Sequence, residues 1–177
     1  MSEIKSKRLI LRQPVLDDAK FLAKGLGDKE VAEYLTVPHP YNLEMAQEWL
    51  KQDFVNKSAN ETSFIVEKKD KTFIGGIGFN ERNNVTFLFY WIAKQYWGQG
   101  FASEATLAVI EWFFNVSGED IIFAGAFHFN EASIKIQQNL GFENIGQTNR
   151  FCPARNKQVK NIETRLNRKT FLRIKTV

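Results

Sequence analysis

The chain has 177 residues, of which 44% are hydrophobic and 14% aromatic, so it can build a full hydrophobic core and is not a disordered segment. Its net charge of +4 is uneven: residues 150–177 carry nine Lys or Arg and one acid, whereas the rest of the chain has a net charge of −4. Cys152 is the only cysteine, which excludes an internal disulfide and a cysteine-based zinc site within one chain.

No apolar run approaches the roughly 20 residues that span a bilayer, and the charged N-terminus lacks the apolar centre of a signal peptide. We therefore expect a soluble, cytoplasmic protein with no membrane partner. Linkers, low-complexity tracts and repeats are absent from the sequence, which favours one domain over residues 1–177. Cys152 is interpreted as a partly buried small residue and not as a catalytic thiol.

The first half of the chain predicts one strand followed by helices. The strand covers residues 9–11. Asp17 and Asp18 are an N-terminal signal that predicts a helix at 19–26. A second helix at 29–35 ends before the prolines that flank His39. The third predicted helix, at 43–55, has an apolar stripe made of Ala46, Trp49, Leu50 and Phe54.

The second half predicts a mixed α/β order. A hairpin of strands at 63–67 and 73–79 leads through a turn at Asn83 and Asn84 to a third antiparallel strand at 87–93. Further elements follow in the order helix 106–114, strand 121–127, helix 133–140, and closing strands around 146–151 and 160–166. Strands and helices in this order favour a mixed sheet.

Between the strand at 87–93 and the next helix, the chain turns through Gly98 and Gly100. Such a turn leaves backbone N–H groups without partners and aimed at one point, which suits a phosphate. A P-loop would need Lys followed by Ser or Thr after Gly100, and a dinucleotide fingerprint would need a glycine or alanine in place of Ser103. Neither pattern fits, and a turn that needs glycine only for its geometry remains an alternative.

A third pattern does fit. Residues 96–105, YWGQGFASEA, resemble the coenzyme A pyrophosphate loop of the GNAT acetyltransferases, in the form seen in the branch of the ribosomal-protein N-terminal acetyltransferases RimJ and RimL. Asn130, Ala132 and Ser133 followed by Leu-Gly-Phe at 140–142 resemble two further signatures of that branch. Residues 8–12 and 74–78 resemble its opening strand and its third strand, so the resemblance covers nearly the whole chain. It implies a GNAT fold, a mostly antiparallel mixed sheet with splayed strands flanked by helices.

The resemblance also implies acetyl-CoA as cofactor and a set of residues that bind it. Residues expected to hold the pyrophosphate are Trp97, Gly98, Gln99, Gly100, Phe101, Ala102 and Ser103. Trp97 stands where the superfamily has Gln or Arg, as is usual in this branch. The backbone of Ile92, Ala93 and Lys94 is expected to pair with the pantetheine arm, with the Ile92 N–H polarising the acetyl carbonyl. Glu104 is expected to hold the loop.

For catalysis, the resemblance assigns Asn130 to the pantetheine and Ser133 to the departing sulfur, although both are also good helix caps. Gln137 stands where another GNAT branch has a tyrosine acid, which strengthens Ser133 as the choice. A general base is harder to place, because Phe87 occupies the position of a frequent Glu. Glu81 and His128 are the remaining candidates, acting directly or through water.

These residues predict an acetyl-CoA-dependent N-acetyltransferase in which a primary amine, on a protein or peptide N-terminus or a small molecule, attacks directly in a ternary complex. Early acids that could attract a cationic amine are Asp28, Glu30, Glu33, Glu44 and Glu48. One alternative is a coenzyme A-binding sensor or partner-binding module without catalysis. Another is RNA association through the basic C-terminal segment by way of a ribosome, although solvated strand faces explain that charge more simply. Members of the branch occur as monomers and homodimers.

Overall fold

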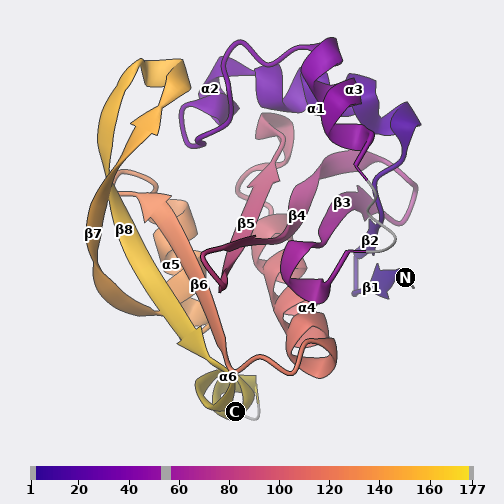
Figure 1. Cartoon of the computed structure of the whole chain (residues 1–177). Helices are drawn as coiled ribbons and strands as arrows, with labels where there is room; N and C mark the ends of the chain where they lie inside the picture. The colour runs from indigo at the N-terminus through magenta and orange to yellow at the C-terminus, as the bar shows by residue number, and fades with distance from the viewer. Residues whose placement is uncertain (1–2, 53–56, 176–177) are drawn as a thin grey trace.

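An eight-stranded sheet runs through the computed structural model, which describes residues 3–52 and 57–175 (Figure 1). Its strands lie in the order β1-β2-β3-β4-β5-β6-β8-β7. All neighbouring pairs are antiparallel except β5 and β6, which run parallel. The strands are β1 (Ile4–Lys5), β2 (Leu9–Arg12), β3 (Ser63–Lys68), β4 (Phe73–Arg82), β5 (Val85–Ile92), β6 (Ile121–Phe127), β7 (Glu143–Cys152) and β8 (Lys157–Asn167).

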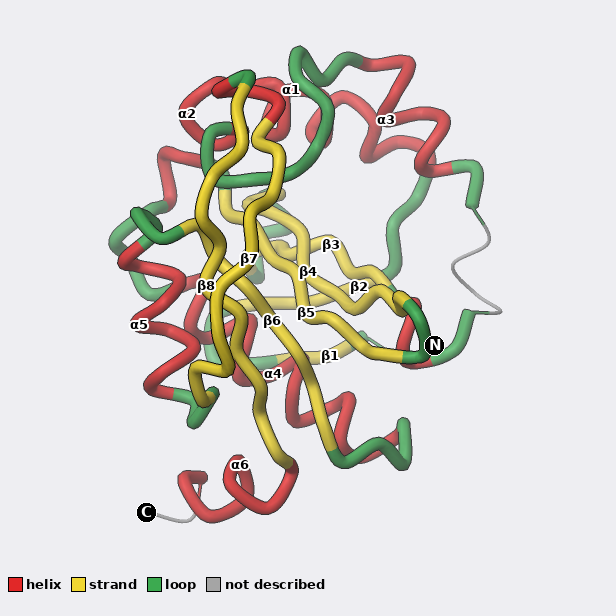
Figure 2. Tube along the Cα trace, turned by 60° about the vertical axis from the view of Figure 1, so that its left-hand side comes forward, coloured by secondary structure: helices red, strands yellow, loops and turns green. Residues whose placement is uncertain are grey.

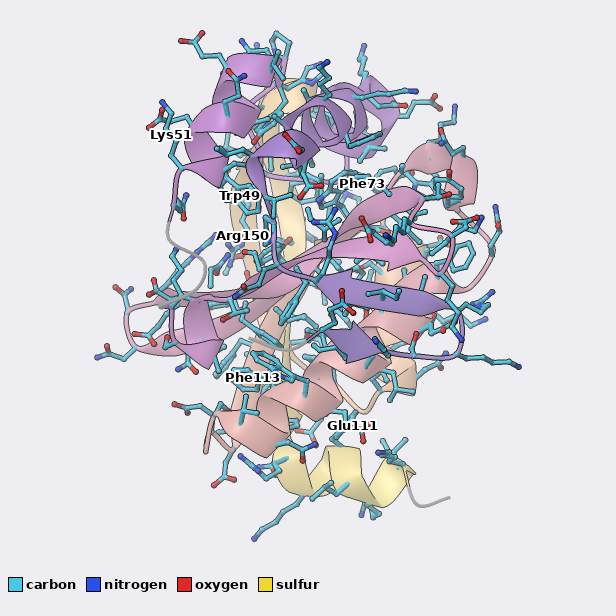
Figure 3. All side chains as sticks on the ribbon, turned by 90° about the vertical axis from the view of Figure 1, so that its right-hand side faces the viewer. Trp49, Lys51, Phe73, Glu111, Phe113 and Arg150 are labelled. Carbon is cyan, nitrogen blue, oxygen red and sulfur yellow. The ribbon has the colours of Figure 1, made fainter. Side chains whose placement is uncertain are left out.

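Helices cover both faces of this sheet because its central strands are apolar on both sides. Phe64 and Val66 of β3 pack against α4, whereas Ile65 between them faces α1 and α3. Phe113 lies fully buried between α4 and the sheet (Figure 3). Figure 2 shows α1 to α3 gathered at one side of the sheet and α4 at the other. The α-helices are α1 (Ala19–Gly27), α2 (Lys29–Ala32), α3 (Leu43–Leu50), α4 (Phe101–Val116), α5 (Glu131–Asn139) and α6 (Arg168–Lys175).

The predicted order of elements is confirmed from β2 to β8, with differences in extent and with two further elements, β1 and α6. The two-residue strand β1, which pairs with β2, was not predicted. Helix α2 ends at Ala32 and not at residue 35, and α4 begins at Phe101, directly after the second loop glycine. Helix α3 ends at Leu50; the last residues predicted for it, including Phe54 of the apolar stripe, lie outside the described residues.

The basic C-terminal segment follows the expectation of strands as far as Asn167, in β7 and β8, but residues 168–175 form helix α6. Phe171 is buried against Phe114 of α4, a contact that the local sequence does not announce. Glu111 on the α6 side of α4 pairs with Lys175 (Figure 3). Other basic side chains of the segment pair with acids: Arg150 with Glu163, Arg155 with Glu33, Arg165 with Glu143, and Arg168 with Asp120. Much of its positive charge is therefore neutralised within the fold.

Within the described part of the chain, no helix combines the length and the apolar character that crossing a bilayer requires.

Candidate active site

The sheet opens between its two parallel strands. β5 and β6 pair only at Phe87 and Phe123, and they diverge toward their C-terminal ends (Figure 1). Each strand is hydrogen-bonded on its other side, β5 to β4 and β6 to β8, so the opening is held rigidly apart. The predicted splay is thus confirmed, and it leaves polar backbone edges facing a gap that side chains only partly fill.

Two adjoining cavities occupy this opening. The large cleft, of about 750 Å³, lies between the end of β5, residues 97–103 and the start of α5. The small cavity, of about 160 Å³, lies between β4, β5, β6 and the β7–β8 hairpin. Residues that line both cavities, and so mark their junction, are Tyr34, Leu35, Tyr90, Asn130 and Ser133.

One wall of the large cleft is backbone. Gly98 and Gly100 have φ of 71° and 77°, a left-handed conformation that glycine adopts without strain. The first helical bond of α4 runs from the Glu104 N–H to the Gly100 carbonyl, at 3.1 Å. The N–H groups of residues 101–103 therefore lie outside the helical ladder, and these residues line the cleft. Together with the helix dipole they form an anion site.

Residues at the start of the sheet hold the glycine loop in place through Glu104 and Gln99. The Glu104 carboxylate accepts hydrogen bonds from Ser6 Oγ at 2.7 Å and from the backbone N–H and Nε of Arg8, both at 2.6 Å. Arg8 also donates to the Gln99 carbonyl at 2.9 Å and lies 4.4 Å from the Phe101 ring centroid. Burial opposes ionisation of Glu104, but these hydrogen bonds outweigh it and lower its pKa. Glu104 thus has a structural role in the loop.

The edge of β5 supplies the opposite wall. The Ala93 N–H donates to the Ile74 carbonyl of β4 at 2.8 Å, so the Ile92 carbonyl and N–H point the other way, toward the cleft. Trp97 Nε1 donates to that Ile92 carbonyl at 2.6 Å. The Ile92 N–H is consequently a backbone donor directed at the cleft, on a strand that β4 holds in place.

Hydroxyl and amide groups meet at the junction of the two cavities. Ser133 Oγ lies 2.7 Å from the Tyr90 hydroxyl and 3.3 Å from Gln137 Nε2. Gln137 Oε1 in turn accepts a hydrogen bond from Thr164 at 2.8 Å. Asn130 Oδ1 accepts from the Ser133 N–H at 3.1 Å, so Asn130 caps α5. The junction is polar, but none of the five residues that form it is a carboxylate, an imidazole or a lysine.

The small cavity has a positively charged wall. Its charged lining residues, among those that the structure describes, are the arginines Arg82 and Arg150, and no carboxylate or imidazole joins them. Glu163 lies behind this wall, 2.9 Å from Arg150. Burial alone would raise the pKa of Glu163, but hydrogen bonds from Thr148 and Arg150 prevail and lower it. Glu163 therefore stays ionised and is a weak proton acceptor.

Comparison with known proteins agrees with this geometry. Residues 8–143 match the family described as the acetyltransferase (GNAT) domain. A Bacillus licheniformis protein named as an uncharacterized N-acetyltransferase, p20, is 31% identical over 152 residues, which cover 82% of this chain and 85% of the relative. The chain belongs to the GNAT acetyltransferase family.

Solved structures of two family members share the fold of this acetyltransferase. Spermidine N-acetyltransferase from Vibrio cholerae, solved in complex with CoA and spermine, superposes with a TM-score of 0.82 at 18% identity, covering 94% of this chain and 99% of the other. Ribosomal-protein-S5-alanine acetyltransferase from Vibrio fischeri superposes with a TM-score of 0.78 at 18% identity, covering 97% and 99%. Two acceptors as different as a polyamine and a protein thus occur on one fold.

The large cleft of this GNAT enzyme fits acetyl-CoA, the cofactor of the family. Its glycine turn presents N–H groups where a pyrophosphate needs donors, and a Cβ on Gly98 would meet no atom within 4 Å, so the mouth is open. The free edge of β5 offers backbone groups to an amide-bearing arm, in the manner of an added strand. The cleft therefore has backbone donors both for the pyrophosphate and for the amide-bearing arm of acetyl-CoA.

Most of the residues predicted to bind the cofactor line the large cleft: Ile92, Trp97, Gly98, Gly100, Phe101, Ala102, Ser103, Asn130 and Ser133. Ala93, Lys94 and Gln99 are not among its lining residues. The Ala93 N–H is used by β4, Lys94 pairs with Glu30, and the Gln99 carbonyl is held by Arg8.

The two candidate bases lie away from both cavities. Glu81 is exposed near the end of β4 and accepts a hydrogen bond from Asn60 at 3.2 Å. His128 is exposed just after β6, with its ring against Phe129. Phe87, which stands where related acetyltransferases often have a Glu, does line the small cavity. The geometry thus brings neither candidate base to the junction.

Sequence reasoning missed three residues of the site. Tyr90 was interpreted only as part of an apolar strand, Gln137 only as a missing tyrosine, and Arg8 only as part of the opening strand motif. One signal was available for Tyr90, since it is a polar-tipped residue inside a buried run, and such hydroxyls usually find a partner. Arg8 and Glu104 are 96 residues apart, and nothing local connects them.

Proposed function

We propose that this GNAT enzyme acetylates α-amino groups at the N-terminus of a protein or peptide, as the RimJ/RimL-like branch does, by direct attack of the amine in a ternary complex. The observation that carries the proposal is the wall of the small cavity, which has two arginines and, within the described chain, no carboxylate or imidazole. The amine must lose its proton before it attacks, and this cavity offers no side-chain base to take it.

The acceptor itself then decides how much neutral amine is present. An α-amino group has a pKa of roughly 7.7–8.0, whereas a lysine-type alkylamine has one near 10.4, so about a hundredfold more of the α-amine is neutral at physiological pH. Positive charge from Arg82 disfavours a bound ammonium further, whereas the charge of Arg150 is offset by its ion pair with Glu163. Both effects favour an α-amine over a polyamine.

The early acids that could attract a polyamine are mostly engaged elsewhere. Glu30 pairs with Lys94, Glu33 with Arg155 and Glu48 with Lys51. Asp28 caps α2 by accepting from the Glu30 N–H at 2.9 Å. These contacts support the same preference, because Glu30, Glu33 and Glu48 already have cationic partners.

In this proposal the chain's residues have distinct roles. When bound, acetyl-CoA supplies the acetyl group as a thioester. The N–H groups of residues 101–103 would hold the pyrophosphate, and the Ile92 N–H would donate to the acetyl carbonyl oxygen, where negative charge would develop. Asn130 fixes the start of α5 at the junction, and Ser133 stands at the sulfur. Proton removal from the amine passes to water, since Glu81 and His128 lie away from the junction.

The test is a free-thiol assay with acetyl-CoA and a matched panel of acceptors: short peptides with free N-termini, the same peptides with blocked N-termini and one lysine, and spermidine. We expect kcat/KM for the free N-termini to exceed that for both alkylamines, and to rise with pH through the pKa of the α-amine. A higher kcat/KM for spermidine would overturn the proposal. Saturable binding of acetyl-CoA without thiol release on any acceptor would favour the sensor alternative.

A further inference from the structure

Ser133 Oγ is contacted by two polar side chains, those of Gln137 and Tyr90. Gln137 is 1% exposed, and its Oε1 accepts from Thr164 Oγ1 at 2.8 Å. The other end of the amide, Nε2, is a donor and lies 3.3 Å from Ser133 Oγ. The first acceptor position of Ser133 is therefore filled from its own helix, one turn further on.

The second contact comes from the sheet. The Tyr90 hydroxyl lies 2.7 Å from Ser133 Oγ and 3.4 Å from the Ser133 backbone carbonyl, an atom that can only accept. In the 2.7 Å contact either hydroxyl can donate, and we take the arrangement in which Tyr90 donates to Ser133 Oγ. Burial raises the pKa of Tyr90, against the effect of its hydrogen bonds to Ser133 and Gln137, so the hydroxyl stays protonated at neutral pH.

A serine hydroxyl has two acceptor positions and one hydrogen to donate. When Tyr90 and Gln137 both donate to Ser133 Oγ, the hydrogen of the serine hydroxyl is left for a third group. Tyr90 and Ser133 line both cavities, so that third group lies at the junction, where the cofactor side meets the acceptor side. Donation by two neighbours also polarises the serine O–H and makes it a better donor.

We infer that Tyr90 and Gln137 are positioning residues, which fix Ser133 as a hydrogen-bond donor to the sulfur that leaves during acetyl transfer. The inference rests on the proposed role of Ser133. In the reaction a C–N bond forms, the C–S bond breaks and its electron pair goes to sulfur. Ser133 stabilises that charge by donating a hydrogen bond, and the proton that completes the thiol comes from the amine nitrogen by way of water. Ser133 itself ends unchanged.

The decisive variants remove single groups. Tyr90→Phe deletes one oxygen and keeps the ring, and Ser133→Ala deletes the proposed donor. We expect Ser133→Ala to lower kcat by about 100-fold. Tyr90→Phe should lower it about tenfold, the effect of losing one hydrogen bond, with the KM for both substrates nearly unchanged. In the Ser133→Ala background, Tyr90→Phe should have no further effect, because a positioning residue acts only through the group that it positions.

Tyr41→Phe is the matched control, since Tyr41 is also partly buried but is not among the lining residues of either cavity. It should leave kcat unchanged. Gln137→Met provides a second test at similar side-chain size, and its effect on kcat should likewise disappear in the Ser133→Ala background. Thr164 keeps a partner there, because it also contacts the Ala124 carbonyl at 3.2 Å.

A second readout needs no acceptor. The pKa of the thiol of bound CoA can be followed by thiolate absorbance as pH is raised. A serine donor favours the thiolate, so this pKa should lie below that of free CoA in the wild-type enzyme, rise in Ser133→Ala, and rise less in Tyr90→Phe. Kinetic effects of the two variants that multiply, or a thiol pKa that Ser133→Ala leaves unchanged, would overturn the inference. Because this measurement uses CoA alone, it holds even if the acceptor proves not to be an α-amine.

Discussion

The two ends of the active site are built from different material. At the cofactor end, the donors are backbone N–H groups of residues 101–103, contiguous in sequence and shaped by two glycines. In the small cavity, where we propose that the acceptor binds, the polar groups are side chains such as Asn80, Arg82 and Arg150, which come from strands distant in the chain. A backbone site tolerates changes in most side chains, whereas a side-chain site changes its chemistry with each substitution. This contrast explains how one fold keeps one cofactor while its acceptors vary.

The largest expected effect tests the backbone end. Gly100→Val forces φ of 77° on a β-branched residue and places its Cβ 3.4 Å from Arg8 Nη2. We expect the Kd for CoA, measured by calorimetry, to rise by about 100-fold as two or more phosphate hydrogen bonds are lost. Gly118→Val is the control, since Gly118 has φ of 71° at the other end of α4 and open space around its Cβ. Unchanged affinity in a folded Gly100→Val variant would remove the basis of the pyrophosphate site.

The next effect tests the acceptor end. Replacing Arg82 and Arg150 together by Met removes the positive wall and releases Glu163 from its ion pair. We expect the preference for peptide N-termini over spermidine, as a ratio of kcat/KM values, to fall about tenfold, while the Kd for CoA stays the same. Arg165→Met is the control, because Arg165 pairs with Glu143 on the same hairpin and does not line the small cavity. An unaltered preference would show that these arginines do not select the acceptor.

A smaller effect concerns the contacts of Glu104, on helix α4, with Ser6 and Arg8 at the start of the sheet. Glu104→Gln weakens the contacts to Ser6 and Arg8, and we expect a loss of several-fold in CoA affinity at neutral pH. The pKa of Glu104 is lowered from its ordinary value of 4.5, so its ionised form stabilises the fold above that pH. The difference in unfolding free energy between wild type and variant should therefore shrink as pH falls through the lowered pKa.

Urea unfolding at a series of pH values measures this difference. Glu111→Gln, on the same helix but 43% exposed, is the comparison, and its effect should be small across the series. A Glu104→Gln difference that grows toward acidic pH would contradict the assigned role.

The smallest expected effect on activity lies outside both ends. Cys152 is fully buried with Phe127 and Val159, and its Sγ lies 3.6 Å from the Glu33 carbonyl. Cys152→Ala should cost about 1 kcal/mol of unfolding free energy and leave kcat/KM unchanged. Loss of turnover at unchanged stability would instead indicate a thiol in the chemistry.

The sequence determined those features that a few neighbouring residues can specify. Gly98 and Gly100 impose a turn because only glycine accepts positive φ readily, and Asn83 and Asn84 mark a hairpin for a related reason, with φ of 52° and 58°. The apolar run at Ile121–Phe127 forms β6 with the predicted bounds. The glycine turn that lines the large cleft was predictable on the same grounds, since residues 97–103 are one continuous segment.

Tertiary structure decided the rest. Helix α6 depends on Phe171 meeting Phe114, and α2 stops at Ala32, beside the β7–β8 turn that Arg155 ties to Glu33. Tyr90 meets Ser133 across 43 residues, because the splay of β5 from β6 places α5 over the open strand edge. Local backbone conformation can be predicted from a short sequence, because a few neighbouring residues specify it. The convergence of side chains follows from strand order and from the packing of the whole sheet, so the acceptor end and its hydroxyl network appear only in the folded protein.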